Sequence, residues 1–348
     1  MIKIKKLKEF IPLSIKNVIK YLYNFLLNIF LFLHQIISKY TNENKIKFLT
    51  FNIPKVLTNE INGRNDCYGH ASILKKYCAL KNNYKLKCII EHGVYFSDFI
   101  IEKDFKFELP GIIFMGKNRE QALKEKNIKC FPIGPYIAYS NNFLSKNQIK
   151  KEKKRLGENL LFIPTHSTRN VKCDYDILKT CNILKNYKKD FDTIRICLYW
   201  KDILNNHHLK YQDMGFECVC AGHMFDKFFL PRLKSILSVS SMILTNKLGT
   251  HIGYSVHLEK PVVMYREKEF QYAYSNSEVM KDSLLRIEKN NDINELFINA
   301  FSSYNDKITE EQYSLVNQYW GLTEIKNPNE LKEIFYECEL LYNNINKT

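Results

Sequence analysis

The sequence lacks the paired metal ligands of zinc-binding proteins. Its ten cysteines contain no Cys-x-x-Cys, and its nine histidines form no His-x-His or His-x-x-x-His pair. Cys88, Cys197 and Cys218 lie instead in apolar, strand-like runs. These spacings argue against a zinc-stabilised or disulfide-stapled domain and indicate free, buried thiols in a reducing compartment.

Acidic residues are scarce relative to basic ones. Lys and Arg total 52 against 37 Asp and Glu, which gives a formal net charge of +15. The excess favours an anionic partner such as membrane headgroups or nucleotide phosphates. No aromatic–basic repeat or recognition helix occurs, so we expect no nucleic-acid partner. With 45% hydrophobic residues among 348, the chain has material for two packed domains.

Residues 1–44 form a basic and hydrophobic arm. Six lysines against one glutamate occupy residues 1–20, and an apolar run covers residues 21–37. No small-residue cleavage site follows, so we expect no removable signal peptide. The run could span a membrane, lie in its interface or pack on the body of the protein. Interfacial attachment satisfies the lysines and the reduced thiols together, and it predicts a cytoplasmic protein that is peripheral on the inner membrane.

Short apolar runs alternate with helical patterns from residue 45 onward. Strands are predicted at residues 45–51, 88–90, 112–115, 129–133, 160–163, 193–199, 216–220, 242–245 and 261–265, with helices between them. Such alternation predicts parallel sheets covered by helices. We predict an α/β protein with two Rossmann-like domains, residues 45–145 and 155–270. The basic segment 141–155 is either the linker between them or a solvated helix.

The predicted binding site is centred on residues 241–265. A strand ends in the loop 246–249, and a helix begins at Thr250, where free N–H groups and the helix dipole favour an anion. With the strand order 3-2-1-4-5, the loop 165–169, which includes Arg169, lies across the same crevice. We predict a donor-phosphate site made of hydroxyl, imidazole, amide and glycine residues from three loops: His166, Ser167, Thr168, His223, Asn246, Gly249, Thr250 and His251.

Two loops of the first half carry the candidate catalytic groups. Glu91, His92 and Gly93 directly follow the strand 88–90, and either Glu91 or His92 could act as general base on a hydroxyl group. The polar segment 62–70 adds Arg64, Asp66 and His70, with a helix-capping loop as its alternative. Zinc is the competing interpretation for His166, His223 and His251, but nearby carboxylates are few, so no metal is expected.

These features together resemble the GT-B superfamily of glycosyltransferases. The segment GTHIGYSVHLEKPVVMY looks like the region that holds the donor nucleotide, where Gly249, Thr250 and His251 open a helix and Lys260 and Pro261 precede a strand. The combination of His92-Gly93 with residues 164–166 is similar to bacterial cell-surface polymer transferases of the capsule, lipooligosaccharide, sialyltransferase-like and teichoic-acid types. The Asp-rich CDP-glycerol pattern and the His-Pro dipeptide of sialyltransferases are absent, so the resemblance names no donor.

The resemblance implies a glycosyltransferase that uses a nucleotide-sugar donor to extend a bacterial cell-surface glycan, without metal or cofactor. Its partners would be a glycan or lipid-linked acceptor and the cytoplasmic membrane surface. A phosphoalditol or sugar-phosphate transferase of the teichoic-acid type is the first alternative. A non-catalytic, membrane-peripheral binding module is the second. Residues 271–348 are expected to be helical and to pack back on the first domain, as in GT-B proteins, without a catalytic role.

Overall fold

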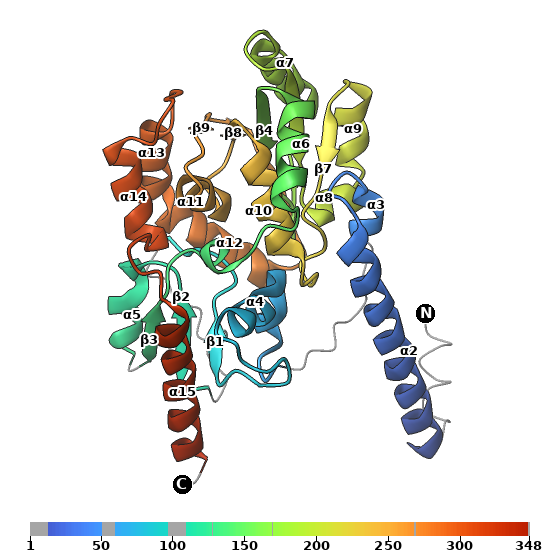
Figure 1. Ribbon diagram of the computed structural model, residues 1–348, viewed down its shortest axis with the longest axis vertical. Coiled ribbons are helices and arrows are strands. Elements are labelled where there is room, and N and C mark those ends of the chain that lie inside the picture. Colours follow the sequence, from blue (N-terminus) through green and yellow to red (C-terminus); the bar gives the residue numbers. More distant parts are fainter. Residues whose placement is uncertain are drawn as a thin grey trace.

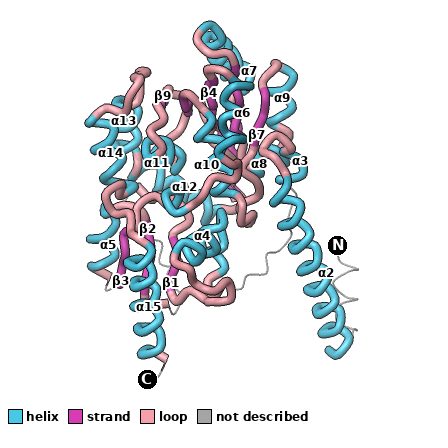
Figure 2. Tube along the Cα trace, viewed as in Figure 1, coloured by secondary structure: helices cyan, strands magenta, loops and turns pink. Residues whose placement is uncertain are grey.

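The computed structural model describes residues 13–50, 60–96, 109–126, 128–168, 170–267 and 269–346. These residues form two parallel sheets and one antiparallel ribbon. Figure 1 shows the sheets at opposite ends of the body, each flanked by helices. Figure 2 shows that the strands gather in these places, with helices and loops around them.

The second unit is a five-stranded parallel sheet. Its strands lie in the order β7-β6-β4-β8-β9, which confirms the predicted order. They are β4 (Asn159–Ile163), β6 (Thr193–Cys197), β7 (Glu217–Val219), β8 (Met242–Thr245) and β9 (Val262–Met264). Helices α7 (Ile177–Asn186), α8 (Trp200–Leu204), α9 (His207–Asp213), α10 (Phe229–Val239) and α11 (Thr250–His257) connect them, together with shorter turns. Strands β4 and β8 are buried at every residue, as expected of a sheet covered on both faces.

The first unit has a smaller parallel sheet in the order β1-β2-β3. It contains η1 (Gly63–Gly69), α4 (His70–Tyr77), β1 (Cys88–Ile90), β2 (Gly111–Phe114), η3 (Lys117–Arg119), α5 (Glu120–Lys124), β3 (Lys129–Pro132) and η4 (Tyr136–Tyr139). The predicted strand at 45–51 is wrong, because its described residues form helix α3 (Ile46–Leu49). Ile46 and Leu49 are buried one helical turn apart, whereas Phe48 between them is 66% exposed.

Two further elements lie outside the parallel sheets, and the first of them confirms the helix alternative that was predicted for the basic segment. The basic segment forms the solvated helix α6 (Lys146–Leu156), which begins with a capping box between Ser145 and Gln148. Strands β5 (Val171–Asp174) and β10 (Gln271–Tyr274) pair antiparallel. This ribbon was not predicted, because its strands are about a hundred residues apart and each is only four residues long.

The C-terminal helices contact both units. They are α12 (Ser277–Lys289), α13 (Asn291–Ala300), α14 (Glu310–Trp320) and α15 (Pro328–Ile345). The indole N–H of Trp320 donates to the main-chain oxygen of Thr250 in α11 over 3.1 Å. Helix α15 lies against the first sheet, where a Cβ on Gly111 would be 2.8 Å from Cys338 Sγ and where Lys129 pairs with Glu337. The chain's end therefore bridges the two units.

Helix α2 (Leu13–Tyr40) projects away from the body (Figure 1). Within the described residues, its segment Tyr21–Tyr40 is the one helix long and apolar enough to cross a membrane, judged by length and composition. Two parallel α/β units and an apolar N-terminal helix confirm the predicted GT-B-type fold class. The domain boundaries stay predictions.

Candidate functional site

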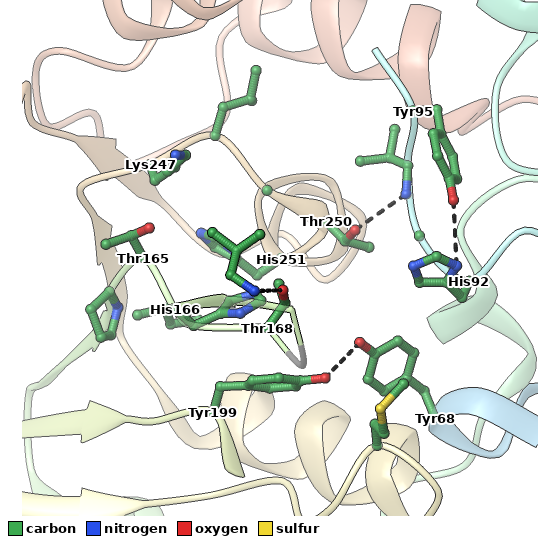
Figure 3. Close-up of a pocket in the computed structure, with 18 of the residues that line it drawn as sticks. Tyr68, His92, Tyr95, Thr165, His166, Thr168, Tyr199, Lys247, Thr250 and His251 are labelled. Carbon is green, nitrogen blue, oxygen red and sulfur yellow. Dashed lines mark hydrogen bonds between the residues drawn. The ribbon is translucent and has the colours of Figure 1, made fainter. Parts of the chain in front are cut away.

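A pocket of about 680 Å³ lies between the two units. The second unit lines it with the loops that follow β4, β6, β7 and β8, and the first unit with η1 and residues 92–96. Parallel strands place the loops after their carboxyl ends on one edge of the sheet, which is where such sheets bind ligands. Figure 3 shows the two sides facing each other across the opening.

The loops after β4 and β8 lie side by side, as predicted. The N–H of Thr165 donates to Asn246 Oδ1 over 2.7 Å, which ties one loop to the other. His166 and Thr168 line the pocket from the first loop, and Gly249, Thr250 and His251 line it from the second. Residue 169 lies outside the described part of the chain, so the contribution predicted for Arg169 stays a prediction.

Helix α11 begins at the pocket wall with Thr250. Thr250 Oγ1 accepts a hydrogen bond of 3.2 Å from the N–H of Val94, so this hydroxyl connects the second unit to the first. The geometry places the dipole-positive end of α11 against the pocket, where it favours negative charge. Gly249 has an extended backbone, and a Cβ there would lie 3.0 Å from the His251 ring. A side chain at position 249 would crowd the His251 ring, so glycine suits this position.

His251 is held as a neutral imidazole. Thr245 Oγ1 donates to the main-chain oxygen of Ile163 over 2.8 Å, so its contact of 2.9 Å with His251 Nε2 requires the ring to donate. Burial, and then the neighbouring His166, lower the pKa of His251 to about 3. Nδ1 is consequently left as an acceptor, and the ring brings no positive charge to an anion.

Two cationic residues that were not predicted as site residues, Lys247 and Arg286, also line the pocket. Lys247 lies over the rings of Phe270 and Tyr272 at 5.1 and 4.8 Å, and its Nζ donates to the Tyr272 hydroxyl. Burial lowers the pKa of Lys247. Arg286 of α12 lies 5.5 Å over the ring of Tyr95. Among the described lining residues none is Asp or Glu. The described lining is therefore electropositive. Part of the region 271–348 lines the pocket, and the expectation that this region has no catalytic role stays a prediction.

Three predicted phosphate ligands do not line the pocket. Ser167 is fully buried, with its hydroxyl on the Cys173 main chain and its N–H 3.0 Å from Asp202 Oδ1. Asn246 is buried and holds Thr165 instead. His223 packs 4.2 Å from the Trp200 ring, accepts the Phe225 N–H on Nδ1, and has its pKa lowered to about 4 by burial. We therefore assign all three to the support of the loops, because buried and internally bonded groups cannot reach a ligand.

The two catalytic candidates separate in the structure. Glu91 is buried, and its Oε1 accepts from Arg119 Nε at 3.1 Å and Nη2 at 2.9 Å. Glu91 does not line the pocket and its carboxylate is turned toward Arg119, which favours His92 of the two candidates as the base. His92 does line the pocket, with Nδ1 3.4 Å from the Tyr95 hydroxyl. Its catalytic role stays a prediction.

The segment 62–70 contributes differently from the prediction. Neither Arg64 nor Asp66 lines the pocket, whereas His70 does. Tyr68 also lines it, with a left-handed φ of 57°. Its N–H donates to Met224 O over 2.5 Å, and its hydroxyl lies 3.0 Å from that of Tyr199 in the second unit. No local sequence signal marks a tyrosine in this conformation.

Among the described residues, no group of three or more His, Cys, Asp or Glu side chains could hold a metal ion. No family model matches the sequence, and no curated protein sequence matches it. Among solved structures, the chain is similar to the wall teichoic acid polymerase TagF, with 11% identity and a TM-score of 0.39 over 77% of this chain and 70% of that one.

Two further structures give weaker likenesses. MnaA of S. aureus with UDP is 10% identical, with a TM-score of 0.34 over 78% of this chain and 82% of that one. The α,α-trehalose 6-phosphate synthase from Burkholderia multivorans is 8% identical, with a TM-score of 0.32 over 78% of this chain and 69% of that one. TM-scores this low support no inference about function. The proposal for the function therefore rests on the residues that line the pocket.

Proposed function

We propose that the protein is a glycosyltransferase that moves a sugar from a nucleotide-sugar donor to a bacterial cell-surface glycan. The observation that supports this most is the electropositive pocket between the two units. The start of α11, Lys247 and Arg286 line it, and no described lining residue is acidic. A helix N-terminus with two cations favours a phosphate group, and a cleft of this volume suits a small molecule.

In the proposed reaction, His92 removes the proton of an acceptor hydroxyl group. The acceptor oxygen then forms a bond to the anomeric carbon, while the bond from that carbon to the phosphate oxygen breaks. The nucleotide leaves with the electron pair of the broken bond. The N–H groups of α11 and the Lys247 ammonium stabilise its developing negative charge, so charge stabilisation requires no metal ion or cofactor. His166 and Thr168 contact the donor from the opposite loop.

The proposed acceptor is a glycan or a lipid-linked glycan at the inner face of the cytoplasmic membrane. Helix α2 supports this location because most of its apolar side chains are exposed. An exposed apolar helix next to a lysine-rich segment matches an anionic membrane surface. The protein is accordingly cytoplasmic and peripheral on the inner membrane in this proposal.

Titration calorimetry with UDP-, GDP- and CMP-sugars tests the donor site. One donor class should bind, and Lys247→Met should weaken its binding about 10- to 100-fold, since a charge-assisted contact is lost. Lys172→Met is the matched control, because Lys172 is exposed on the neighbouring ribbon and pairs with Asp174. Absence of binding by every nucleotide sugar would refute the donor site and favour a binding module without catalysis.

A sugar-phosphate or phosphoalditol transferase is the second candidate. His92 and His166 line the same pocket as Lys247, and a lining rich in histidine, with no carboxylate among its described residues, also suits attack on a phosphorus atom. Phosphorus-31 NMR of the product separates the two candidates. A new phosphodiester signal that the acceptor lacks establishes phosphoryl transfer, whereas a product that gains a sugar but no phosphorus relative to the acceptor establishes glycosyl transfer.

A further inference from the structure

Helix α2 and the turn after it are fastened to one wall of the pocket. The loop between β7 and α10 lines the pocket through Ala221 and Met224. The N–H of Cys220 donates to Glu43 O, and the N–H of His223 donates to Leu49 O, each over 2.9 Å. The segment that follows α2 thereby accepts hydrogen bonds from two main-chain N–H groups of this loop, and buried N–H groups need such partners.

A buried charge network adds side-chain contacts to the same junction. Arg232 of α10 is fully buried, and its guanidinium group donates to Ala221 O at 2.5 Å and to Asp226 Oδ2 at 3.2 Å. It also donates to Ser38 O at 2.8 Å and to Ser38 Oγ at 2.9 Å, and the Ser38 hydroxyl donates to Asp226. Because a buried charge needs all its partners, the network holds α2 and the pocket loop in one arrangement.

We propose that α2 lies in the interface of an anionic membrane while its docked end braces this pocket wall, so that membrane binding and donor binding are linked. The inference rests on the proposed donor site and adds its regulation by the membrane. Ser38, Asp226 and Arg232 are the positioning residues, since none of them lines the pocket.

The exposed surface of α2 identifies the partner. The buried residues His34 and Ser38 lie one helical turn apart, and Gln35 beside them donates to Phe225 O over 3.4 Å, so these residues mark a docked stripe at the C-terminal end of α2. Large apolar side chains cover its other faces, among them Leu22, Phe25, Leu26, Phe32, Leu33 and Ile36. In the sequence, residues 1–20 carry six lysines against one glutamate, so the N-terminal part of the chain that includes the start of α2 is strongly basic. Apolar and basic character together fit an anionic bilayer.

The docked contacts distinguish a helix that lies on the membrane from one that spans it. A span made of Tyr21–Tyr40 would place His34 and Ser38 in the hydrocarbon region. Ser38 would then leave Arg232 and Asp226, and the brace would be lost. Lying in the interface keeps the docked stripe on the protein and gives the remaining apolar faces to the lipid.

The test uses the full chain with phosphatidylglycerol vesicles, and neutral phosphatidylcholine vesicles for comparison. Hydrogen exchange at the amides of Cys220 and His223 should slow on the anionic vesicles. UDP, GDP or CMP, whichever binds, should bind about 2- to 30-fold more tightly there. Ser38→Ala should abolish both effects while vesicle binding persists, and Ser38→Thr should restore them. Thr41→Ala is the matched control, because Thr41 directly follows α2 and its hydroxyl donates to Ile37 O of that helix rather than to the pocket loop.

The paired variant Phe25→Asp with Phe32→Asp should lose vesicle binding and keep the vesicle-free nucleotide affinity. Faster exchange of the two amides on vesicles would overturn the proposal in favour of a spanning helix. Equal behaviour of Ser38→Ala and Thr41→Ala would overturn the brace. Dimerisation that requires Phe25 and Phe32, without vesicle binding, would assign the apolar faces to a second copy. If no nucleotide binds, the donor site fails, while the exchange measurement still decides the brace.

Discussion

The two units build their walls of the pocket in different ways. The second unit uses regular geometry: β4 and β8 end side by side, and the bond from Thr165 to Asn246 fixes their loops. The first unit uses irregular backbone, with Tyr68 at a φ of 57° and His92 beyond the end of β1. A regular wall can offer preformed N–H groups to a phosphate. An irregular wall can aim individual side chains at a reacting atom, at some cost in strain. In the proposed reaction, the regular wall therefore binds the donor phosphate and the irregular wall supplies the base.

The largest expected effect separates His92 from its neighbour Glu91. His92→Ala should lower kcat about 10²- to 10⁴-fold with donor affinity unchanged, because general base catalysis is lost. Glu91→Gln should keep kcat per folded molecule but lower the free energy of unfolding by about 3 kcal/mol, since Arg119 loses a buried counter-charge. Kinetics and urea unfolding of both variants check this division. A kcat loss in Glu91→Gln as deep as that in His92→Ala would contradict it.

The same division explains what the sequence could predict. The apolar runs that form β4 and β8 are visible in the sequence, and with the usual strand order of such sheets they become neighbours. Because a parallel sheet gathers the loops after its strands at one edge, the sequence also predicts that their loops oppose each other. Which side chain points into the pocket depends on the residues that pack behind it. Ser167 turns toward Cys173, which lies in a strand that was not predicted. Glu91 turns toward Arg119, which is 28 residues away in the sequence. Lys247 lay in the predicted loop, but its role depends on Phe270 and Tyr272 of a ribbon that has no local signal.

The buried histidines of both walls should make the protein sensitive to acid. Burial lowers the pKa of His70 in the first unit to about 3 and that of His223 in the second to about 4. Both are neutral in the folded state, so their stabilising contribution is complete above pH ~6.5, the unfolded value, and falls as the pH drops toward the folded pKa. Each should contribute a loss of about 2 kcal/mol between pH 8 and pH 5.

Urea unfolding at a series of pH values measures this loss. His223→Phe should reduce the slope between pH 5 and pH 6.5, because one of the buried titrating imidazoles is gone. An unchanged slope in this variant would assign the acid sensitivity to other groups.

Next in size is the contact through which α14 supports the second wall. A Cβ on Gly253 would collide with the Trp320 ring, whose N–H bonds Thr250. Gly253→Ala should therefore destabilise the protein by about 1–3 kcal/mol through overpacking, and it should weaken donor binding by displacing Thr250. His257→Ala at the far end of α11 is the control. Thermal unfolding and calorimetry read the two effects. Full donor affinity in Gly253→Ala would show that α14 does not position the start of α11.

The smallest effect concerns the one direct hydroxyl pair that crosses between the walls in the described residues lining the pocket. Tyr68 and Tyr199 lie 3.0 Å apart at their hydroxyl groups, while the Tyr68 ring packs 4.7 Å from Phe229. Tyr68→Phe and Tyr199→Phe each keep the ring and remove one partner. A double-mutant cycle on the free energy of unfolding should give a coupling of about 1 kcal/mol. A coupling that grows when donor is bound would show that the hydroxyl pair closes the units around it. A coupling near zero would mean that Phe229 and the Met224 carbonyl hold Tyr68 at its left-handed φ without help from the second wall.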